Sequence, residues 1–127
     1  MATLWTLGGD ATDPHRLAAF WAVALGYILE PGYDYEGGAS IVDPDGVGPA
    51  IGFLQVPEAK VVKNRFHIDI RPAGEFPVDP TKHEQRVRAK SAELVDAGAT
   101  VVREDAYGGQ FSHIVMLDPE GNEFCVA

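Results

Sequence analysis

The sequence runs twice through the same succession of elements, and this repeat limits the chain to few folds. The two glycines suited to end a helix, Gly26 and Gly98, lie 72 positions apart, and the acidic-proline turns starting at Asp43 and Asp118 lie 75 apart. In each half a strand is followed by a helix and then by several strands. We therefore infer a duplicated βαβββ module, and because each sheet would otherwise expose an apolar face, the two modules are expected to share a core.

The pattern of apolar residues and turn signals places these elements along the chain. In the first half we expect strands at 3–7, 40–42 and 50–56, the first of them stopped by Gly8 and Gly9, and a helix from Asp13 to Gly26. In the second half we expect strands at 65–71, 100–103, 111–117 and 123–126, a loop at 72–80 and a helix over about 80–97. The predicted class is α+β, with a curved mixed sheet around a cup-shaped pocket.

Residues 65–71 are the most informative segment for function. In an extended chain Phe66, Ile68 and Ile70 fall on one face, and His67, Asp69 and Arg71 fall on the other. A solvated face usually carries serine, threonine or lysine, whereas this one carries three ionisable groups of different chemistry. We therefore predict that this face lines a pocket, although an ordinary wet surface is the alternative.

Composition narrows the class of protein. The chain has 127 residues, of which 46% are hydrophobic, so it is one domain or two small modules around one core. No apolar run is long enough to span a bilayer, and the lone Cys125 fits a reducing compartment, so we expect a cytoplasmic protein without membrane contact. The net charge of −9 disfavours nucleic acid and suits a neutral or cationic ligand, or simply keeps the protein in solution.

Three segments, 13–27, 67–72 and 118–125, resemble the glyoxalase-like branch of the vicinal oxygen chelate superfamily, which also holds extradiol dioxygenases and bleomycin and fosfomycin resistance proteins. The resemblance covers nearly the whole chain. It implies a single glyoxalase-like domain over 1–127, with one module at about 1–60 and a second at about 64–127. It also implies a cup-shaped site and, in many members, a homodimer.

The resemblance further implies where a metal would bind. Metal-using members place histidine, glutamate or glutamine at four inward positions, which fall here near Thr6, Gln55, His67 and Cys125. Cys125 stands where the family's carboxylate follows the acidic turn, and this departure weakens the set. Glu123 lies two residues earlier on the same face, so the metal set to consider is His67, Gln55 and Glu123.

Two functions remain open. The first is a small-molecule-binding protein without a metal, which sequesters a drug or metabolite; the residues expected to contact the ligand are Trp5, Phe53, Gln55, Arg71, Tyr107, Glu123 and Cys125. The second is a lyase, isomerase or dioxygenase acting on a small carbonyl or diol, with either a divalent metal on His67 or His67 as a general base oriented by Asp69. We expect no cofactor under the first function and a divalent metal under one version of the second. The partners expected are a small molecule and a second copy of the chain.

Overall fold

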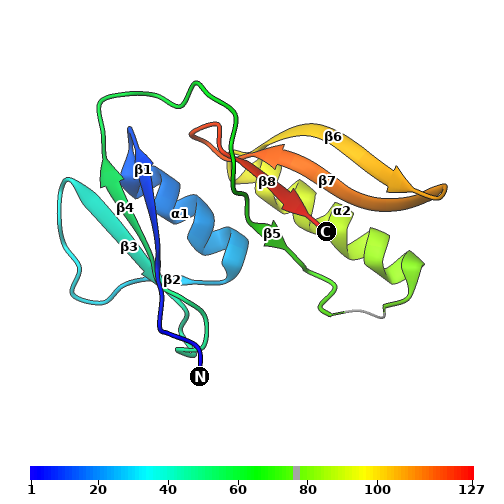
Figure 1. Cartoon of the computed structure of the whole chain (residues 1–127), viewed down its shortest axis with the longest axis horizontal. Helices are drawn as coiled ribbons and strands as arrows, with labels where there is room; N and C mark the ends of the chain where they lie inside the picture. Colours follow the sequence, from blue (N-terminus) through cyan, green and yellow to red (C-terminus); the bar gives the residue numbers. More distant parts are fainter. Residues whose placement is uncertain (76–77) are drawn as a thin grey trace. The chain divides into compact units, whose positions relative to one another are not determined.

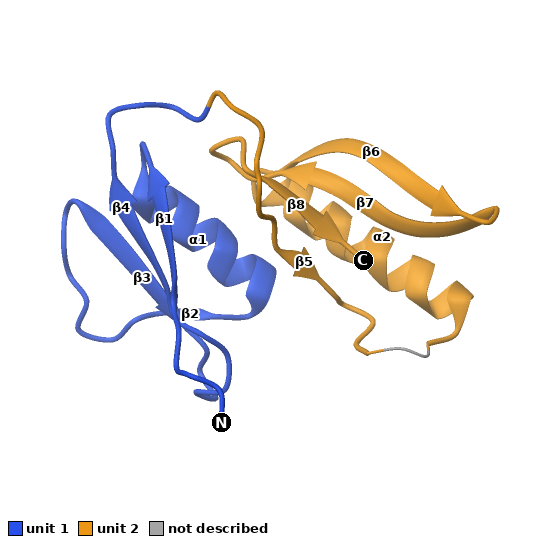
Figure 2. Cartoon of the chain, viewed as in Figure 1, with its two compact units in different colours: residues 1–60 blue, residues 61–127 orange. Residues whose placement is uncertain are grey.

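The computed structural model describes residues 1–75 and 78–127, and the chain divides into two compact units, 1–60 and 61–127 (Figure 2). The first unit contains β1 (Leu7–Ala11), α1 (Pro14–Leu25), β2 (Ile28–Leu29), β3 (Gly38–Val42) and β4 (Ile51–Gln55) (Figure 1). The second contains β5 (Asp69–Ile70), α2 (Pro80–Asp96), β6 (Thr100–Tyr107), β7 (Gln110–Leu117) and β8 (Glu123–Val126). Each unit is therefore a βαβββ module.

The two sheets have the same topology. The strand order is β1-β4-β3-β2 in the first unit and β5-β8-β7-β6 in the second. In each unit the first strand pairs parallel with the last strand, and the other pairs are antiparallel. The predicted α+β class with two βαβββ modules is confirmed, as two four-stranded mixed sheets, each with one helix.

Helix α1 forms because its ends and its apolar stripe agree. The side chain of Asp13 accepts a hydrogen bond from the Arg16 N–H, Pro14 occupies the first turn, and Gly26 ends the helix at φ 70°. Leu17 and Phe20 are each 2% exposed. On the sheet, the residues facing this helix are Ala11, Ala39, Ile41, Ile51 and Phe53, all buried. The opposite face of the sheet is thus left for other contacts.

Helix α2 repeats this arrangement in the second unit. Asp79 caps it by accepting from the Lys82 N–H at 3.0 Å. The helix runs behind β6, β7 and β8 in Figure 1, with Val87 and Leu94 fully buried against that sheet. The sheet residues on this side are Ile70, Ile114, Met116, Phe124 and Val126, all buried. Alternation then turns Asp69 and Cys125 to the other face.

The two acidic-proline turns are built alike. The Asp43 carboxylate accepts hydrogen bonds from the N–H groups of Asp45 and Gly48, at 2.9 and 2.7 Å. Asp118, only 4% exposed, accepts from the N–H groups of Glu120 and Asn122, both at 2.9 Å. In both modules an aspartate therefore holds together the turn that precedes the last strand.

Several predicted boundaries were wrong. The first strand was predicted at 3–7, but β1 begins at Leu7 and runs through Gly8 and Gly9, because its ladder with β4 outweighs the preference of glycine for turns. The strand predicted at 65–71 is much shorter in the structure, where β5 covers Asp69–Ile70. Just before it, the carbonyl of Ile68 accepts a hydrogen bond from the Cys125 N–H. The strand predicted at 100–103 continues to Tyr107. The loop predicted at 72–80 includes 76–77, outside the described residues.

No helix within 1–75 and 78–127 combines the length and the apolar character that a membrane crossing requires.

Candidate functional site

A cavity of about 480 Å³ lies in the second unit. Most of its lining comes from the face of the sheet opposite the one packed on α2, and His83 of α2 lines it too. Its lining includes charged side chains from β5, β6 and β8 and from the segment before β5. Such a volume falls in the range of small-molecule sites, about 300–1,000 Å³. The lining residues predicted from the sequence are His67, Asp69, Arg71, Tyr107, Glu123 and Cys125.

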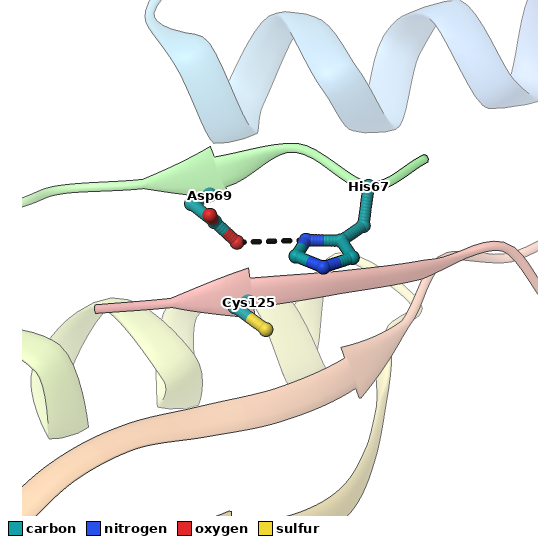
Figure 3. A group of neighbouring side chains, drawn as sticks. All are labelled: His67, Asp69 and Cys125. Atoms are coloured by element: carbon teal, nitrogen blue, oxygen red, sulfur yellow. Dashed lines mark hydrogen bonds and ion pairs between the residues drawn. The ribbon is translucent and has the colours of Figure 1, made fainter. Parts of the chain in front are cut away.

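His67 and Asp69 form a hydrogen-bonded pair in this cavity (Figure 3). They are two residues apart in an extended segment, so their side chains point the same way, and the Nδ1 atom of His67 lies 2.9 Å from Oδ1 of Asp69. Because a carboxylate only accepts, this contact requires the proton on Nδ1, and in the neutral ring Nε2 then presents its lone pair. The side chains are 48% and 39% exposed, so a ligand can reach the ring.

Cys125 lies beside this pair. It is the register partner of Asp69 across the parallel ladder of β5 and β8. One ligand atom from each of His67, Asp69 and Cys125 lies within 4.8 Å of the others. Burial, and then the negative charge of Asp69 and a hydrogen bond to it, raise the pKa of the Cys125 thiol to about 11. The thiol is therefore protonated at neutral pH and donates to Asp69.

A second histidine–aspartate pair lines the same cavity. His113 Nε2 lies 3.0 Å from Asp105 Oδ2, and its Nδ1 lies 2.9 Å from the hydroxyl oxygen of Ser112. Arg103 binds the same carboxylate through Nε at 3.1 Å. The sequence analysis missed Asp105 because it ended the strand at 103, and it passed over His113 within the strand predicted at 111–117. The period-two pattern of Arg103, Asp105 and Tyr107 would have identified the first of these two residues.

Glu123 is held in place by two residues of the segment that precedes β5. Its carboxylate forms an ion pair with Lys63 at 2.8 Å, and its backbone N–H donates to the side-chain oxygen of Asn64 at 3.2 Å. Its side chain is 22% exposed. A metal at Glu123 would therefore have to displace a lysine.

Three of the predicted residues belong to the first unit and do not line this cavity. Trp5 precedes β1 and is 62% exposed, whereas Phe53 is 5% exposed within the core. Gln55 ends β4, and its side-chain nitrogen donates to the carbonyl of Thr12 at 3.4 Å. Among the described histidines, cysteines and acidic residues, one donor group in the second unit is His67, Asp69 and Cys125. The set of His67, Gln55 and Glu123 draws on both units and stays a prediction.

Comparison with known proteins gives the family. The model of the glyoxalase-like domain matches residues 6–127. No protein among the curated ones matches the chain.

Solved structures share the fold. A glyoxalase/bleomycin resistance protein/dioxygenase family enzyme from Burkholderia phytofirmans is 20% identical, with a TM-score of 0.71 over 98% of this chain and 97% of that one. A possible glyoxalase from Bacillus cereus is 18% identical, with a TM-score of 0.68 over 99% and 98%. The fosfomycin resistance protein FosX from Listeria monocytogenes, solved with Mn(II), is 11% identical, with a TM-score of 0.69 over 99% and 91%. The family match confirms the resemblance seen in the sequence: the chain belongs to the glyoxalase-like domain family of the vicinal oxygen chelate superfamily.

Proposed function

We propose that the second unit binds a small organic molecule over His67 and Asp69, and that this binding needs no metal. The observation that carries the proposal is the 2.9 Å contact between these two side chains inside a cavity of about 480 Å³. Asp69 fixes the orientation of the ring, so Nε2 is ready to accept a hydrogen bond from a ligand hydroxyl or amine. Pre-organisation of this kind lowers the entropic cost of binding.

The charges around the cavity indicate the class of ligand. Three basic side chains, Lys63, Arg71 and Arg103, face three carboxylates, Asp69, Asp105 and Glu123. The net acidity of the chain is therefore not concentrated here, and a neutral or zwitterionic molecule suits the cavity better than a strongly charged one. Tyr107, 72% exposed, adds an aromatic ring on which a flat group of the ligand can stack.

A thermal-shift screen of hydroxylated, carbonyl-bearing and zwitterionic compounds, antibiotics included, tests this function. We expect hits whose affinity falls at least tenfold in His67→Ala. The matched control is His15→Ala, because His15 is another exposed histidine, in the first unit, where its Nε2 lies 3.1 Å from the carbonyl oxygen of Glu36. Equal affinity of a hit for wild type and His67→Ala would reject the proposed site.

A second candidate is an enzyme, a lyase, isomerase or dioxygenase, that moves a proton on a carbonyl or diol substrate. It is favoured by the same pair of side chains, since a histidine oriented by a carboxylate is the usual form of a general base. Exchange of substrate protons with D₂O, followed by NMR, tests this candidate with compounds from the screen. Loss of exchange in His67→Gln with retained binding would support it, and unchanged exchange would reject His67 as the base.

A metal-assisted version of this enzyme would use His67, Asp69 and Cys125. The donor set, one nitrogen, one carboxylate oxygen and one sulfur, suits zinc better than magnesium or calcium. The donor atoms lie up to 4.8 Å apart, whereas two metal–ligand bonds of about 2.3 Å span less than this, so the side chains would have to move closer together. The Cys125 thiol would also have to lose its proton. A zinc ion would supply a Lewis acid here. Elemental analysis of native protein and His67→Ala tests this version, which predicts stoichiometric metal in the first only.

We also propose that the protein forms a homodimer and resides in the cytoplasm. Support for a dimer comes from β6, an eight-residue strand at the edge of its sheet, on which Val101 and Val102 are nearly half exposed. Light scattering on the purified protein tests the dimer: a monomeric mass at micromolar concentration would reject it. Fractionation of the source cells tests the location.

A further inference from the structure

Strand β7 contains a bulge where it pairs with β6 (Figure 1), and this bulge changes which face its residues present. Asp105 on β6 pairs with His113, and the next residue, Ala106, pairs with Phe111, so Ser112 is the extra residue. In an uninterrupted strand Ser112 and His113 would lie on opposite faces. Here both line the cavity of the second unit. The bulge therefore brings a hydroxyl and an imidazole that are adjacent in the sequence to one cavity.

Phe111 is turned the other way and fixes the bulge by its packing. The guanidinium carbon of Arg88 lies 4.7 Å from the centre of its ring, and the ring of His83 lies 5.9 Å away. Both of these residues belong to α2. Phe111 is thus anchored on the helix, and Ser112, the next residue, is held in the position that exposes its hydroxyl to the cavity.

Ser112, His113 and Asp105 form one chain of hydrogen bonds. His113 Nε2 lies 3.0 Å from Asp105 Oδ2, and His113 Nδ1 lies 2.9 Å from Ser112 Oγ. Because the carboxylate only accepts, the first contact requires the proton on Nε2, and in the neutral ring Nδ1 then accepts from the serine hydroxyl. This is the order of groups that activates a serine nucleophile, with the two ring nitrogens exchanged relative to the usual triad.

The imidazole in this chain is held in place on both sides. Arg103 binds the Asp105 carboxylate through Nε at 3.1 Å, and the ring of Tyr107 lies 6.2 Å from that of His113, at 31°. The His113 side chain is 17% exposed and that of Asp105 is 28% exposed. Tyr107 is 72% exposed, so its ring can still receive a flat group from a ligand. The arrangement is therefore positioned in advance of any substrate.

We propose that Ser112 is a nucleophile that accepts the acyl group of a small aryl ester. The ester carbonyl would lie at Ser112, and the aromatic leaving group would stack on Tyr107. The reaction uses the cavity described above but neither His67 nor Asp69, so it goes beyond the binding proposed there and can fail without it. A neutral ester also suits a cavity lined by charges of both signs.

The acylation step needs only groups of this chain. Oγ of Ser112 attacks the carbonyl carbon while its proton passes to Nδ1 of His113, which gives a tetrahedral oxyanion. The guanidinium groups of Arg71 and Arg103, which line the same cavity, would offset its negative charge. The intermediate then collapses: the bond between the carbonyl carbon and the phenolic oxygen breaks, and the leaving phenolate takes the proton from Nδ1.

Water completes the reaction. It gives a proton to Nδ1 of His113, its oxygen bonds to the carbonyl carbon of the acyl-serine, and the carboxylic acid leaves as the proton returns to Oγ of Ser112. The sum is one ester and one water converted into one phenol and one carboxylic acid. No electron is transferred, so no oxidant or reductant is required.

Treatment of the full chain with p-nitrophenyl acetate at pH 8 tests the proposal. We expect a burst of p-nitrophenolate of one equivalent per chain, with one acetyl group on the peptide that contains Ser112. Ser112→Ala should abolish this burst, and Ser40→Ala, which removes a serine of the first unit, should leave it unchanged. His113→Gln should slow acylation at least a hundredfold, and Asp105→Asn at least tenfold, whereas His15→Ala should have no effect.

Two further measurements separate a nucleophile from a polar network that only stabilises the bulge. Ser112→Cys keeps a nucleophilic atom at this position and should still be acetylated there, whereas Ser112→Ala should melt close to the wild-type temperature. The acylation rate of the wild type should rise as His113 loses its ring proton, over about pH 5–8, and then level off.

Three outcomes would overturn the proposal. The first is absence of acetyl groups from Ser112 in the wild type at millimolar ester. The second is an equal acylation rate in His113→Gln and the wild type. The third, which decides the matter even where His113→Gln does not fold, is a wild-type rate that increases in proportion to hydroxide across the whole pH range, because an unassisted serine would react in that way.

Discussion

Asp69 and Cys125 oppose each other across the parallel ladder of β5 and β8. Burial raises the pKa of the Cys125 thiol, and the negative charge of Asp69 raises it further. The position at which the resemblance implies a carboxylate thus holds a protonated thiol, whose single proton is directed at Asp69. An ion that demands a thiolate would first have to remove this proton. This relationship links the departure from the family pattern to the chemistry of the cavity.

The reactivity of Cys125 gives the first prediction. With a pKa of about 11, roughly one thiol in a thousand is ionised at pH 8, so alkylation by iodoacetamide should be slow. Asp69→Asn removes the negative charge and lowers the pKa of the thiol, so the alkylation rate at pH 8 should rise severalfold. Mass spectrometry follows the reaction, with Asp34→Asn, which removes a charge from the first unit, as the control. An unchanged rate in Asp69→Asn would show that Asp69 does not act on the thiol.

The same thiol predicts how stability depends on pH. Its pKa is raised from an ordinary 9.0 to about 11 in the folded protein, so folding retains a proton that the unfolded chain releases. The stabilisation is complete below pH 9 and is lost as the pH rises towards 11. In urea unfolding, the wild type should therefore lose stability more steeply than Cys125→Ala between pH 9 and 11. Parallel curves for the two proteins would contradict this.

The helix caps give the third prediction. Asp13 and Asp79 each accept a hydrogen bond from a backbone N–H of the first turn, in α1 and in α2. Replacing either by alanine should lower the free energy of unfolding by about 1 kcal/mol. Chemical denaturation measures the change, and Asp34→Ala serves as a control outside the helices. A loss confined to one module would show that the two caps do not contribute equally.

The turn at Asp43 gives the fourth prediction. Hydrogen bonds from the N–H groups of Gly48, Asp45 and Val47 hold the pKa of this carboxyl below its ordinary 3.8. Its stabilisation is therefore present above pH 3.8 and is lost as the pH falls through the lowered value. Asp43→Asn should lower the melting temperature by several degrees at pH 7, and the difference from wild type should shrink towards pH 3. Asp45→Asn is the neighbouring control, expected to change little.

The repeat and the two helices could be predicted from the sequence because their signals are local. Asp13 and Asp79 mark the helix starts, and the helix ends follow from Gly26 and Gly98, within a residue or two. The two turns at Asp43 and Asp118 are likewise local, since each aspartate bonds backbone groups within five positions. Patterns of this kind do not depend on what the rest of the chain does.

The remaining features depend on pairing between distant segments. Gly8 and Gly9 read as a strand end, yet the ladder to β4 carries β1 through both. The alternation of polar side chains continues beyond residue 103, into β6. The His113–Asp105 pair lies there, and it depends on the pairing of β6 with β7, whose register shifts on either side of this position. The alternation of residues in the sequence predicts that His67 and Asp69 lie on one face. The 2.9 Å distance between their side chains depends on the backbone conformation and could not be predicted from that pattern.

The most direct test of the account is the tautomer of His67. Side-chain ¹⁵N NMR of histidine-labelled protein at pH 8 distinguishes Nδ1–H from Nε2–H rings, and the chain has four histidines to assign, for which His67→Ala identifies the signal. We predict that His67 carries its proton on Nδ1, shared with Asp69, and shifts to the Nε2–H form in Asp69→Ala. An Nε2–H ring in the wild type would contradict the account, because the atom meant to receive the ligand would then be a donor rather than an acceptor.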